Sequence, residues 1–151
     1  MRIPLRVNGQ SVEVEAEPDE MLLVVLRREL GLMSVRQTCG VGVCGACTAL
    51  VDGEPISTCI LLAPLAREAE ITTVEGLGGD DPVQQAFVEA HAFQCGYCIP
   101  GMVLTARRLL EEDPEPTEEK VKNYMGGNLC RCGSYAKILD AVNLASGRRS
   151  A

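Results

Sequence analysis

The chain has 151 residues, which is enough for one domain of ordinary size or for two small ones. Apolar residues make up 46% of it, aromatic residues make up only 3%, and the formal net charge is −7. This acidic balance argues against nucleic acid as a partner, because a phosphate-binding surface needs a basic patch. The dense positive spots are three arginine pairs, which we expect on solvated helix faces or at termini: Arg27-Arg28, Arg107-Arg108 and Arg148-Arg149.

The N-terminus has no apolar stretch long enough for a signal peptide, and no segment approaches about 18 unbroken apolar residues. We therefore expect no membrane span and a cytoplasmic location, although a partner could carry an export signal for a folded complex. In a reducing cytoplasm, eight cysteines more often bind metal than form disulfides.

The first half of the chain predicts β-strands around a single helix. Polarity alternates on both sides of Asn8-Gly9, a pair that favours a tight hairpin turn. Leucines at helical spacing predict a helix that Gly31 ends, and Asp52-Gly53 predicts a second hairpin. The expected elements are strands at about 2–8 and 10–16, a helix at about 20–30, a hairpin over 47–58, and a strand at about 70–75.

The composition changes over residues 76–82, where glycine, aspartate and proline cluster as they do in a linker. Beyond this point the periodicity is helical, and Thr117 with two following glutamates makes a good helix start. We therefore predict two small domains, a β-rich one over residues 1–76 and an all-helical one over residues 77–151. The expected helices lie at about 82–91, 101–112, 117–124 and 135–145.

Four cysteines of the first half have the spacing of an iron–sulfur site. Cys39-x4-Cys44-x2-Cys47, followed by Cys59, matches the plant-type ferredoxin pattern for a [2Fe–2S] cluster. Two irons bridged by two sulfides need four thiolates that converge on a compact unit. Structural zinc is the alternative, but zinc favours paired C-x2-C knuckles or histidine ligands, which this spacing does not supply.

The residues between these cysteines suit a loop that wraps a cluster. Gly40, Gly42 and Gly45 allow unusual φ values and a close approach of backbone N–H groups. Val41 and Val43 are expected to keep water away and so to tune the reduction potential. We expect this loop to lie near the surface and to face an electron acceptor.

The second half holds two further cysteine pairs, Cys95-x2-Cys98 and Cys130-x-Cys132. Each pair precedes an expected helix, whose positive N-terminal end favours an anionic group. Two pairs on facing helix ends could hold the two irons of a second [2Fe–2S] cluster, although two close pairs taken alone could also bind zinc. His91, the single histidine, cannot make a Rieske centre, which needs two. We expect it to pack or to hydrogen-bond locally.

Three segments carry a resemblance to a known family: "CGVGVCGACTALVDG", "QCGYCIPGM" and "GGNLCRCGSYAKILDAV". Together they resemble the iron–sulfur small subunit of the molybdenum hydroxylase (xanthine oxidase) family. Relatives include the small subunits of carbon monoxide, isoquinoline, nicotinate and aldehyde dehydrogenases. The likeness runs from residue 3 to about residue 145, and the ordered motifs at matching separations make it specific.

The resemblance implies an α+β fold, in which an N-terminal β-grasp plant-type ferredoxin domain precedes an all-α four-helix-bundle domain, each with a [2Fe–2S] cluster. It implies that this chain does no substrate chemistry, because a large partner subunit holds the molybdopterin cofactor and hydroxylates the substrate. Electrons would pass to the helical-domain cluster, then to the ferredoxin-domain cluster. They would go on to FAD on a medium subunit, or to another acceptor such as a cytochrome.

The resemblance also places residues that match Gln94 and Cys132 against the molybdopterin cofactor, and the large subunit over the Cys95 and Cys130 region. The sequence departs from the family at Thr38, where glycine is usual, and at Gly133-Ser134, where Thr-Gly is commoner. Neither departure removes a ligand. The alternatives are a free-standing two-cluster ferredoxin-like carrier and a zinc-stabilised interaction module.

Overall fold

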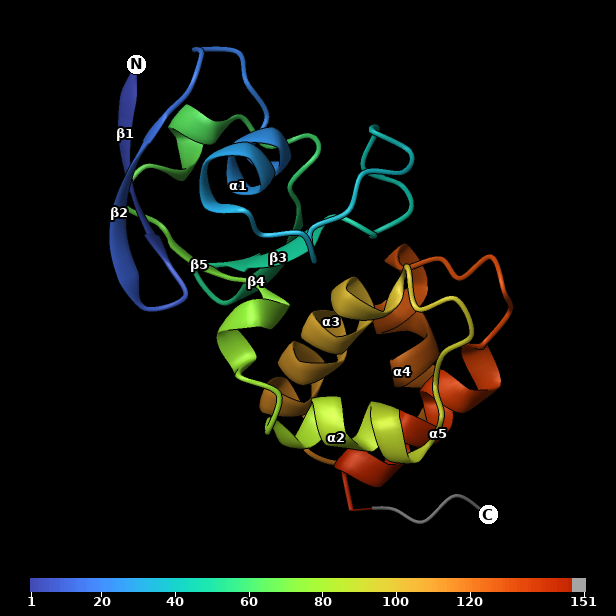
Figure 1. Ribbon diagram of the computed structural model, residues 1–151. Helices are drawn as coiled ribbons and strands as arrows, with labels where there is room; N and C mark the ends of the chain where they lie inside the picture. Colours follow the sequence, from blue (N-terminus) through green and yellow to red (C-terminus); the bar gives the residue numbers. More distant parts are fainter. Residues whose placement is uncertain (148–151) are drawn as a thin grey trace.

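The computed structural model describes residues 1–147 as two lobes joined side by side, one built on a sheet and one of helices (Figure 1). The prediction for Arg148-Arg149 lies outside the described residues. The first lobe contains strands β1 (Arg2–Val7), β2 (Gln10–Glu15), β3 (Thr48–Val51), β4 (Glu54–Ser57) and β5 (Glu70–Thr72), with helix α1 (Leu22–Leu30). The second contains helices α2 (Pro82–Glu89), α3 (Ile99–Glu112), α4 (Glu118–Tyr124) and α5 (Tyr135–Ala145).

The strands form one mixed sheet in the order β2-β1-β5-β3-β4 within the described residues. The β1–β5 pair is parallel, whereas β1–β2, β3–β4 and β3–β5 are antiparallel. The β1–β2 hairpin turns at Asn8-Gly9 and the β3–β4 hairpin at Asp52-Gly53, as predicted, and all four turn residues have positive φ. The sheet presents Ile3, Leu5 and Ile71 to α1, which buries Val25 and Leu26 in the same core.

Two expected elements of this lobe differ at their ends. The first helix starts at Leu22 rather than near residue 20, because Met21 is extended and forms a β-bridge with Leu62. The last strand stops at Thr72, and residues Val74–Leu77 form a short 3-10 helix (η2) instead. This turn leads the chain out of the sheet and toward α2.

The helical lobe packs around a core of its own, which includes Phe87, Met102, Leu109, Ile138 and Val142. Helix α3 starts at Ile99, two residues before the predicted start at residue 101. Pro100 can occupy its first turn, because a missing N–H is tolerated there. The α+β class with an all-helical second part is confirmed. No helix within residues 1–147 is both long enough and apolar enough to cross a lipid bilayer.

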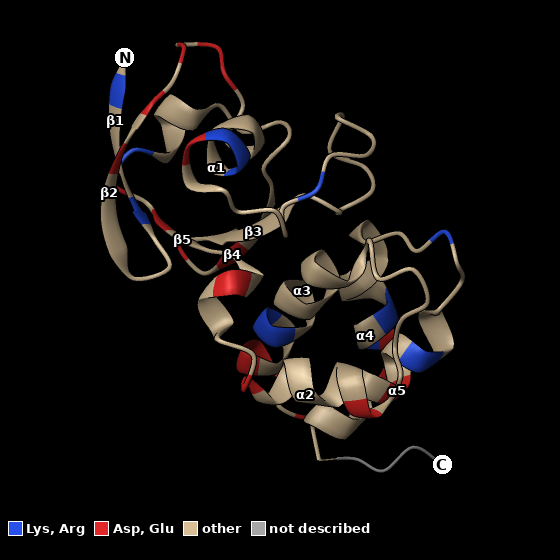
Figure 2. Cartoon of the chain, viewed as in Figure 1, with Lys and Arg blue, Asp and Glu red and all other residues tan. Residues whose placement is uncertain are grey.

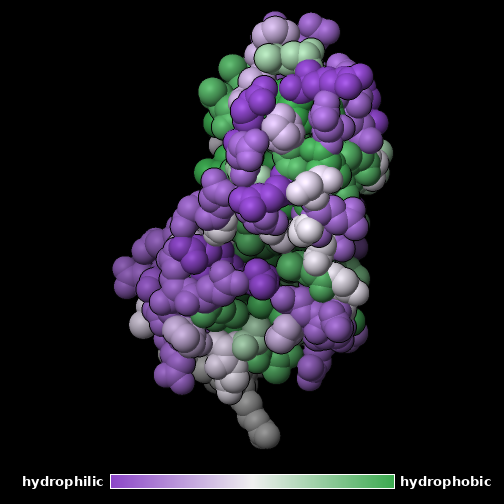
Figure 3. Space-filling view, turned by 90° about the vertical axis from the view of Figure 1, so that its left-hand side faces the viewer, coloured by the Kyte–Doolittle hydropathy of each residue, from purple (hydrophilic) through white to green (hydrophobic). Residues whose placement is uncertain are grey.

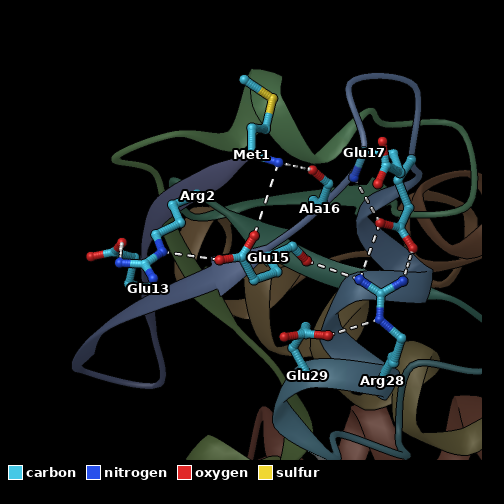
Figure 4. Close-up of polar contacts among 9 residues, drawn as sticks. Met1, Arg2, Glu13, Glu15, Ala16, Glu17, Arg28 and Glu29 are labelled. Carbon is cyan, nitrogen blue, oxygen red and sulfur yellow. Dashed lines mark hydrogen bonds and ion pairs between the residues drawn. The ribbon is translucent and has the colours of Figure 1, made fainter.

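The arginine pairs do more than cover solvated faces. Arg107 pairs with Asp81 at 3.0 Å, and Arg108 reaches Glu54 of β4 at 2.6 Å, so the second pair joins separate elements. At the far edge of the first lobe, Arg28 pairs with Glu29 and donates to the Glu15 carbonyl at 2.9 Å, close to where Arg2 pairs with Glu15 (Figure 4). Hydrophilic residues cover much of this edge of the molecule (Figure 3).

Helix α3 forms the contact between the lobes, since it packs against β3 and β4. Two glycines make the approach close. A Cβ added to Gly101 would lie 2.4 Å from the Gly45 carbonyl oxygen, and one added to Gly45 would lie 2.4 Å from that of Gly127. The buried Asn128 donates across the same contact to the Gly45 carbonyl at 3.2 Å. Backbone therefore meets backbone where the lobes join.

Candidate metal centres

The loop that carries Cys39 and Cys44 projects from the first lobe beside the helical lobe (Figure 1). Its backbone N–H groups turn inward, because those of Val41, Val43 and Cys44 donate to the Cys39 sulfur at 3.4, 3.4 and 3.5 Å. These donors lower the pKa of the Cys39 thiol to about 6, since they stabilise the thiolate. The loop is therefore arranged for a sulfur that carries negative charge.

The loop glycines Gly40, Gly42 and Gly45 have φ values of 69, 76 and 74°, as the sequence predicted. Only at Gly45 does the space itself also exclude a side chain through backbone contact, with Gly127. The expectation for Val41 and Val43 is wrong in this chain, because the two residues are 67% and 59% exposed. With three glycines turning the backbone inward, the valine side chains point outward and do not exclude water.

Cys47 and Cys59 lie deeper, at the end of the sheet. Both are buried, and burial is the main reason why the pKa of Cys59 rises to about 11. The Thr58 hydroxyl donates to the Cys47 carbonyl at 2.7 Å and so ties the distant Cys59 segment to the loop. The thiols interact in pairs that affect each other's pKa, Cys39 with Cys44 and Cys47 with Cys59. The structure thus brings the four predicted residues together as two pairs.

The second set is divided in the same way. Here the thiol of Cys95 interacts with that of Cys132, and the thiol of Cys98 with that of Cys130, so that each affects the pKa of the other. Cys98 is the N-cap residue of α3, and Cys130 and Cys132 precede α5. The two pairs that are adjacent in sequence, Cys95 with Cys98 and Cys130 with Cys132, therefore lie near helix N-termini, as predicted. The Tyr97 N–H donates to the Cys95 sulfur at 3.5 Å and lowers the pKa of Cys95, whereas burial raises that of Cys98 to about 12.

Cys130 is held by the first residues of α5. Burial opposes ionisation of its thiol, but hydrogen bonds to the sulfur, among them one from the Ser134 N–H at 3.4 Å, together outweigh burial and lower its pKa. The Cys130 N–H in turn donates to the Tyr135 hydroxyl at 2.8 Å. The donor that Ser134 supplies is its backbone N–H, which any residue but proline would offer there, so the Gly133-Ser134 departure leaves this contact to the second set intact.

The donor sets fit two-iron clusters. The eight cysteines are free thiols, and each set offers two close pairs, which is what two bridged irons require. Inward N–H groups and helix N-termini supply the positive ends of dipoles that a negative cluster needs.

The two sets share a seam of backbone contacts. The Leu129 N–H, next to Cys130, donates to the Cys44 carbonyl at 2.8 Å and so joins a residue of one set to a neighbour of the other. A cavity of about 370 Å³ lies at this seam. It is lined from the first lobe by Thr38, Cys44 and Ala46, and from the second by Cys95, Tyr97, Cys98, Leu129, Cys130, Arg131 and Tyr135.

Thr38 therefore faces the second set, although it directly precedes the first ligand of the first set. Gln94 and Cys132, the pair expected beside a molybdopterin cofactor, contact each other, since the Gln94 amide donates to the Cys132 carbonyl at 3.2 Å. Cys95 and Cys132 are exposed, as a face covered by a partner would require. His91 lies outside both sets, exposed after the end of α2, where its N–H donates to the Val88 carbonyl at 3.1 Å.

The segments around the cysteines carry no acidic residue, although the chain as a whole is acidic. Residues 36–47, 91–100 and 125–137 contain no Asp or Glu, and their charged residues are Arg36, Arg131 and Lys137. Figure 2 shows the acidic residues on the strands and helices and on the turn between β2 and α1, outside these loops. Together, fold and sites define a two-centre iron–sulfur protein of the electron-transfer class.

Comparison with known proteins gives the same picture. Residues 5–73 match the 2Fe-2S iron-sulfur cluster binding domain, and residues 73–143 match a second [2Fe-2S] binding domain. The chain is 48% identical to one of the nicotinate dehydrogenase subunits of Pseudomonas putida, over 97% of this chain and 96% of that protein. It is also 48% identical to the nicotinate dehydrogenase small FeS subunit of Eubacterium barkeri, over 97% and 95%.

Among solved structures, the quinoline 2-oxidoreductase of Pseudomonas putida 86 matches with a TM-score of 0.92 and 42% identity, covering 97% of this chain and 93% of the matched chain. The aldehyde oxidoreductase of Desulfovibrio desulfuricans matches with a TM-score of 0.92 and 39% identity over 97% of this chain and 17% of the longer one. The chain therefore belongs to the family of iron–sulfur small subunits of molybdenum hydroxylases and serves electron transfer without substrate chemistry of its own. Two [2Fe–2S] domains decide against the zinc alternative.

Proposed function

We propose that the eight cysteines hold two [2Fe–2S] clusters with the pairing that the thiols already have. In the first cluster, Cys39 and Cys44 would bind one iron, and Cys47 and Cys59 the other. In the second cluster, Cys95 and Cys132 would share one iron, and Cys98 and Cys130 the other. The close thiol pairs within each set carry this assignment. Each cluster supplies a one-electron carrier.

We also propose the direction of transfer. The exposed Gln94 and Cys132 would meet the molybdopterin cofactor of a large partner subunit, so the second set receives electrons. The loop over residues 39–45, on the first lobe, would then face the acceptor, which is FAD on a medium subunit or a cytochrome. The seam from Cys44 to Leu129 supports passage between the two sets, because a hydrogen bond joins a residue of the first set to a neighbour of the second there. The division at residues 76 and 77 remains part of the same proposal.

The chain's own residues would tune this transfer. N–H donors to the Cys39, Cys95 and Cys130 sulfurs stabilise negative charge on the ligands, which favours the reduced state. Burial of Cys47 and Cys59 limits water at the inner end of the first set. We place the assembled protein in the cytoplasm, since eight free thiols suit a reducing compartment.

Single-cysteine variants test the assignment. The loaded chain should contain about four irons, two for each cluster, and should give two distinct EPR signals on reduction. Cys59→Ala should lose the first signal and about half of the iron, whereas Cys98→Ala should lose the second signal and keep the first. If either variant lost both signals while the chain stayed folded by circular dichroism, the independent sets would be wrong.

Purification from the native host tests the partner. We expect the chain to elute with a large subunit that contains molybdenum, and the flavin content of that complex identifies the acceptor. Elution of a fully active chain alone would instead support the free-standing carrier.

A further inference from the structure

The segment before Cys39 and the loop between Cys95 and Cys98 hold each other by reciprocal contacts. The Arg36 guanidinium donates from Nη1 to the carbonyl oxygens of Gly96 and Tyr97, at 2.7 and 2.8 Å. It also lies over the Tyr97 ring, 5.1 Å from the ring centroid. In return, the Tyr97 hydroxyl donates to the Gln37 carbonyl at 2.8 Å. Two residues thus tie together segments about 60 positions apart.

Each end of this contact is fixed to its own cysteine set. The Arg36 N–H donates to the carbonyl of Ala46 at 3.1 Å, and the buried Ala46 directly precedes Cys47. The Tyr97 N–H donates to the Cys95 sulfur at 3.5 Å. A movement of either loop would therefore be transmitted to the other through Arg36 and Tyr97.

The contact also places a positive charge beside the second set. Arg36 is the one charged residue in the segment 36–47, and its guanidinium rests on carbonyls that lie between Cys95 and Cys98. An iron–sulfur cluster becomes more negative on reduction, and a nearby cation favours the more negative state. The planar guanidinium suits the position because one group can grip two carbonyls and stack on a ring.

We propose that Arg36 and Tyr97 form an interdomain clamp that positions the Cys95–Cys98 loop against the first cysteine set, and that the Arg36 charge raises the reduction potential of the second centre. Both are positioning residues, since neither supplies a ligand. The proposal rests on the cluster assignment given above. Leu129 and Asn128 already hold the segment before Cys130 against the first lobe. The clamp does the same for the Cys95–Cys98 loop.

Three variants of the iron-loaded full chain separate the effects. Arg36→Met removes the charge and both hydrogen bonds, Arg36→Lys keeps the charge without the planar grip, and Tyr97→Phe removes only the hydroxyl bond. Arg108→Gln is the control, because it breaks another contact between the lobes, with Glu54. Residue 108 lies ten residues along α3 from Cys98, which is about 15 Å of helix. Low-temperature EPR of the fully reduced chain reports the magnetic interaction between the two centres, and redox titration reports each potential.

We expect Arg36→Met to change the splitting caused by the magnetic interaction. It should also weaken reduction of the second centre on the order of tenfold in the one-electron equilibrium constant, about 59 mV. Arg36→Lys should keep the potential of the unaltered chain but change the splitting. Tyr97→Phe should change the splitting alone, and Arg108→Gln should change neither.

Iron content separates the possible failures. If Arg36→Met and Tyr97→Phe keep their full iron content and match the unaltered chain in splitting, the clamp is wrong and the cluster assignment stands. If Arg108→Gln changes the splitting as much as Arg36→Met and Tyr97→Phe do, the splitting reports the general docking of the lobes, and the clamp is wrong. If the unaltered chain shows no second signal, the assignment fails and the clamp fails with it.

Discussion

The close approach of the two lobes makes a sharp prediction for Gly101→Ala. Gly101 lies in the first turn of α3, where it has no positive φ. Helix propensity alone therefore predicts that alanine stabilises the chain by up to about 1 kcal/mol. The new Cβ, however, would lie 2.4 Å from the Gly45 carbonyl oxygen, a distance that requires one backbone to move.

The Gly45 carbonyl cannot move freely, because three donors hold it. The Thr48 hydroxyl, the Thr48 N–H and the Asn128 amide donate to it at 2.7, 3.1 and 3.2 Å. Overpacking of this kind costs about 1–3 kcal/mol, and each hydrogen bond that breaks adds about 0.5–1.5 kcal/mol. We therefore expect a net loss of roughly 1–3 kcal/mol, opposite in sign to the effect of propensity.

Urea unfolding of the iron-loaded chain, followed by circular dichroism and by loss of visible absorbance, measures this effect. Gly126→Ala is the matched control, since a Cβ there would meet no atom within 4 Å. The control should unfold near the midpoint of the unaltered chain, and Gly101→Ala should unfold at clearly lower urea. A Gly101→Ala chain as stable as the control would refute the close contact between the lobes.

Three further predictions follow from single contacts. Gly45→Ala and Gly40→Ala should each lower the free energy of unfolding by about 1–2 kcal/mol, because alanine is strained at positive φ. Of the two variants, only Gly45→Ala should also lose its iron faster in a chelator assay, because the new Cβ would collide with backbone at Gly45 but would meet no atom within 4 Å at Gly40. The hydrogen bond from Arg28 lowers the pKa of Glu20, so its stabilisation exists above the ordinary value of 4.5 and disappears as pH falls through the lowered pKa. Urea midpoints of Glu20→Gln should thus converge with those of the unaltered chain in acid, and a pH-independent gap would contradict the pairing. Thr38→Gly should open the cavity of the second set to water and raise the potential of that centre only, and a shift confined to the first centre would exclude this placement.

The ligand sets and most of the elements could be predicted because their signals are local. Positive φ at Asn8-Gly9 and at Asp52-Gly53 follows from residue type, and the spacing from Cys39 to Cys47 fits one loop around one cluster. The outward direction of Val41 and Val43 could not be predicted in this way. Their pattern is apolar, but the glycines between them turn the N–H groups, rather than the side chains, toward the Cys39 sulfur.

The contacts between the two sets could not be predicted, because they depend on how the lobes dock. Nothing in the sequence singles out Arg36, yet Arg36 and Asn128 each donate to backbone carbonyls of the other lobe. The sequence held one signal for them: Asn128 stands two residues before Cys130, within a segment free of acids. Thr38 is similar, since its neighbour Cys39 belongs to the first set while its own position lines the second.

The placement of charge explains how an acidic chain can hold two anionic centres. Each oxidised [2Fe–2S] unit with four thiolates carries roughly −2, so two of them bring the formal charge from −7 to roughly −11. A uniform spread of acids would oppose their reduction, but the acids lie outside the cysteine segments, where solvent and salt screen them. Near the sulfurs the remaining contributions are N–H groups, helix N-termini, Arg36 and Arg131, which all favour negative charge. The local field, rather than the net charge, therefore governs whether electrons are accepted.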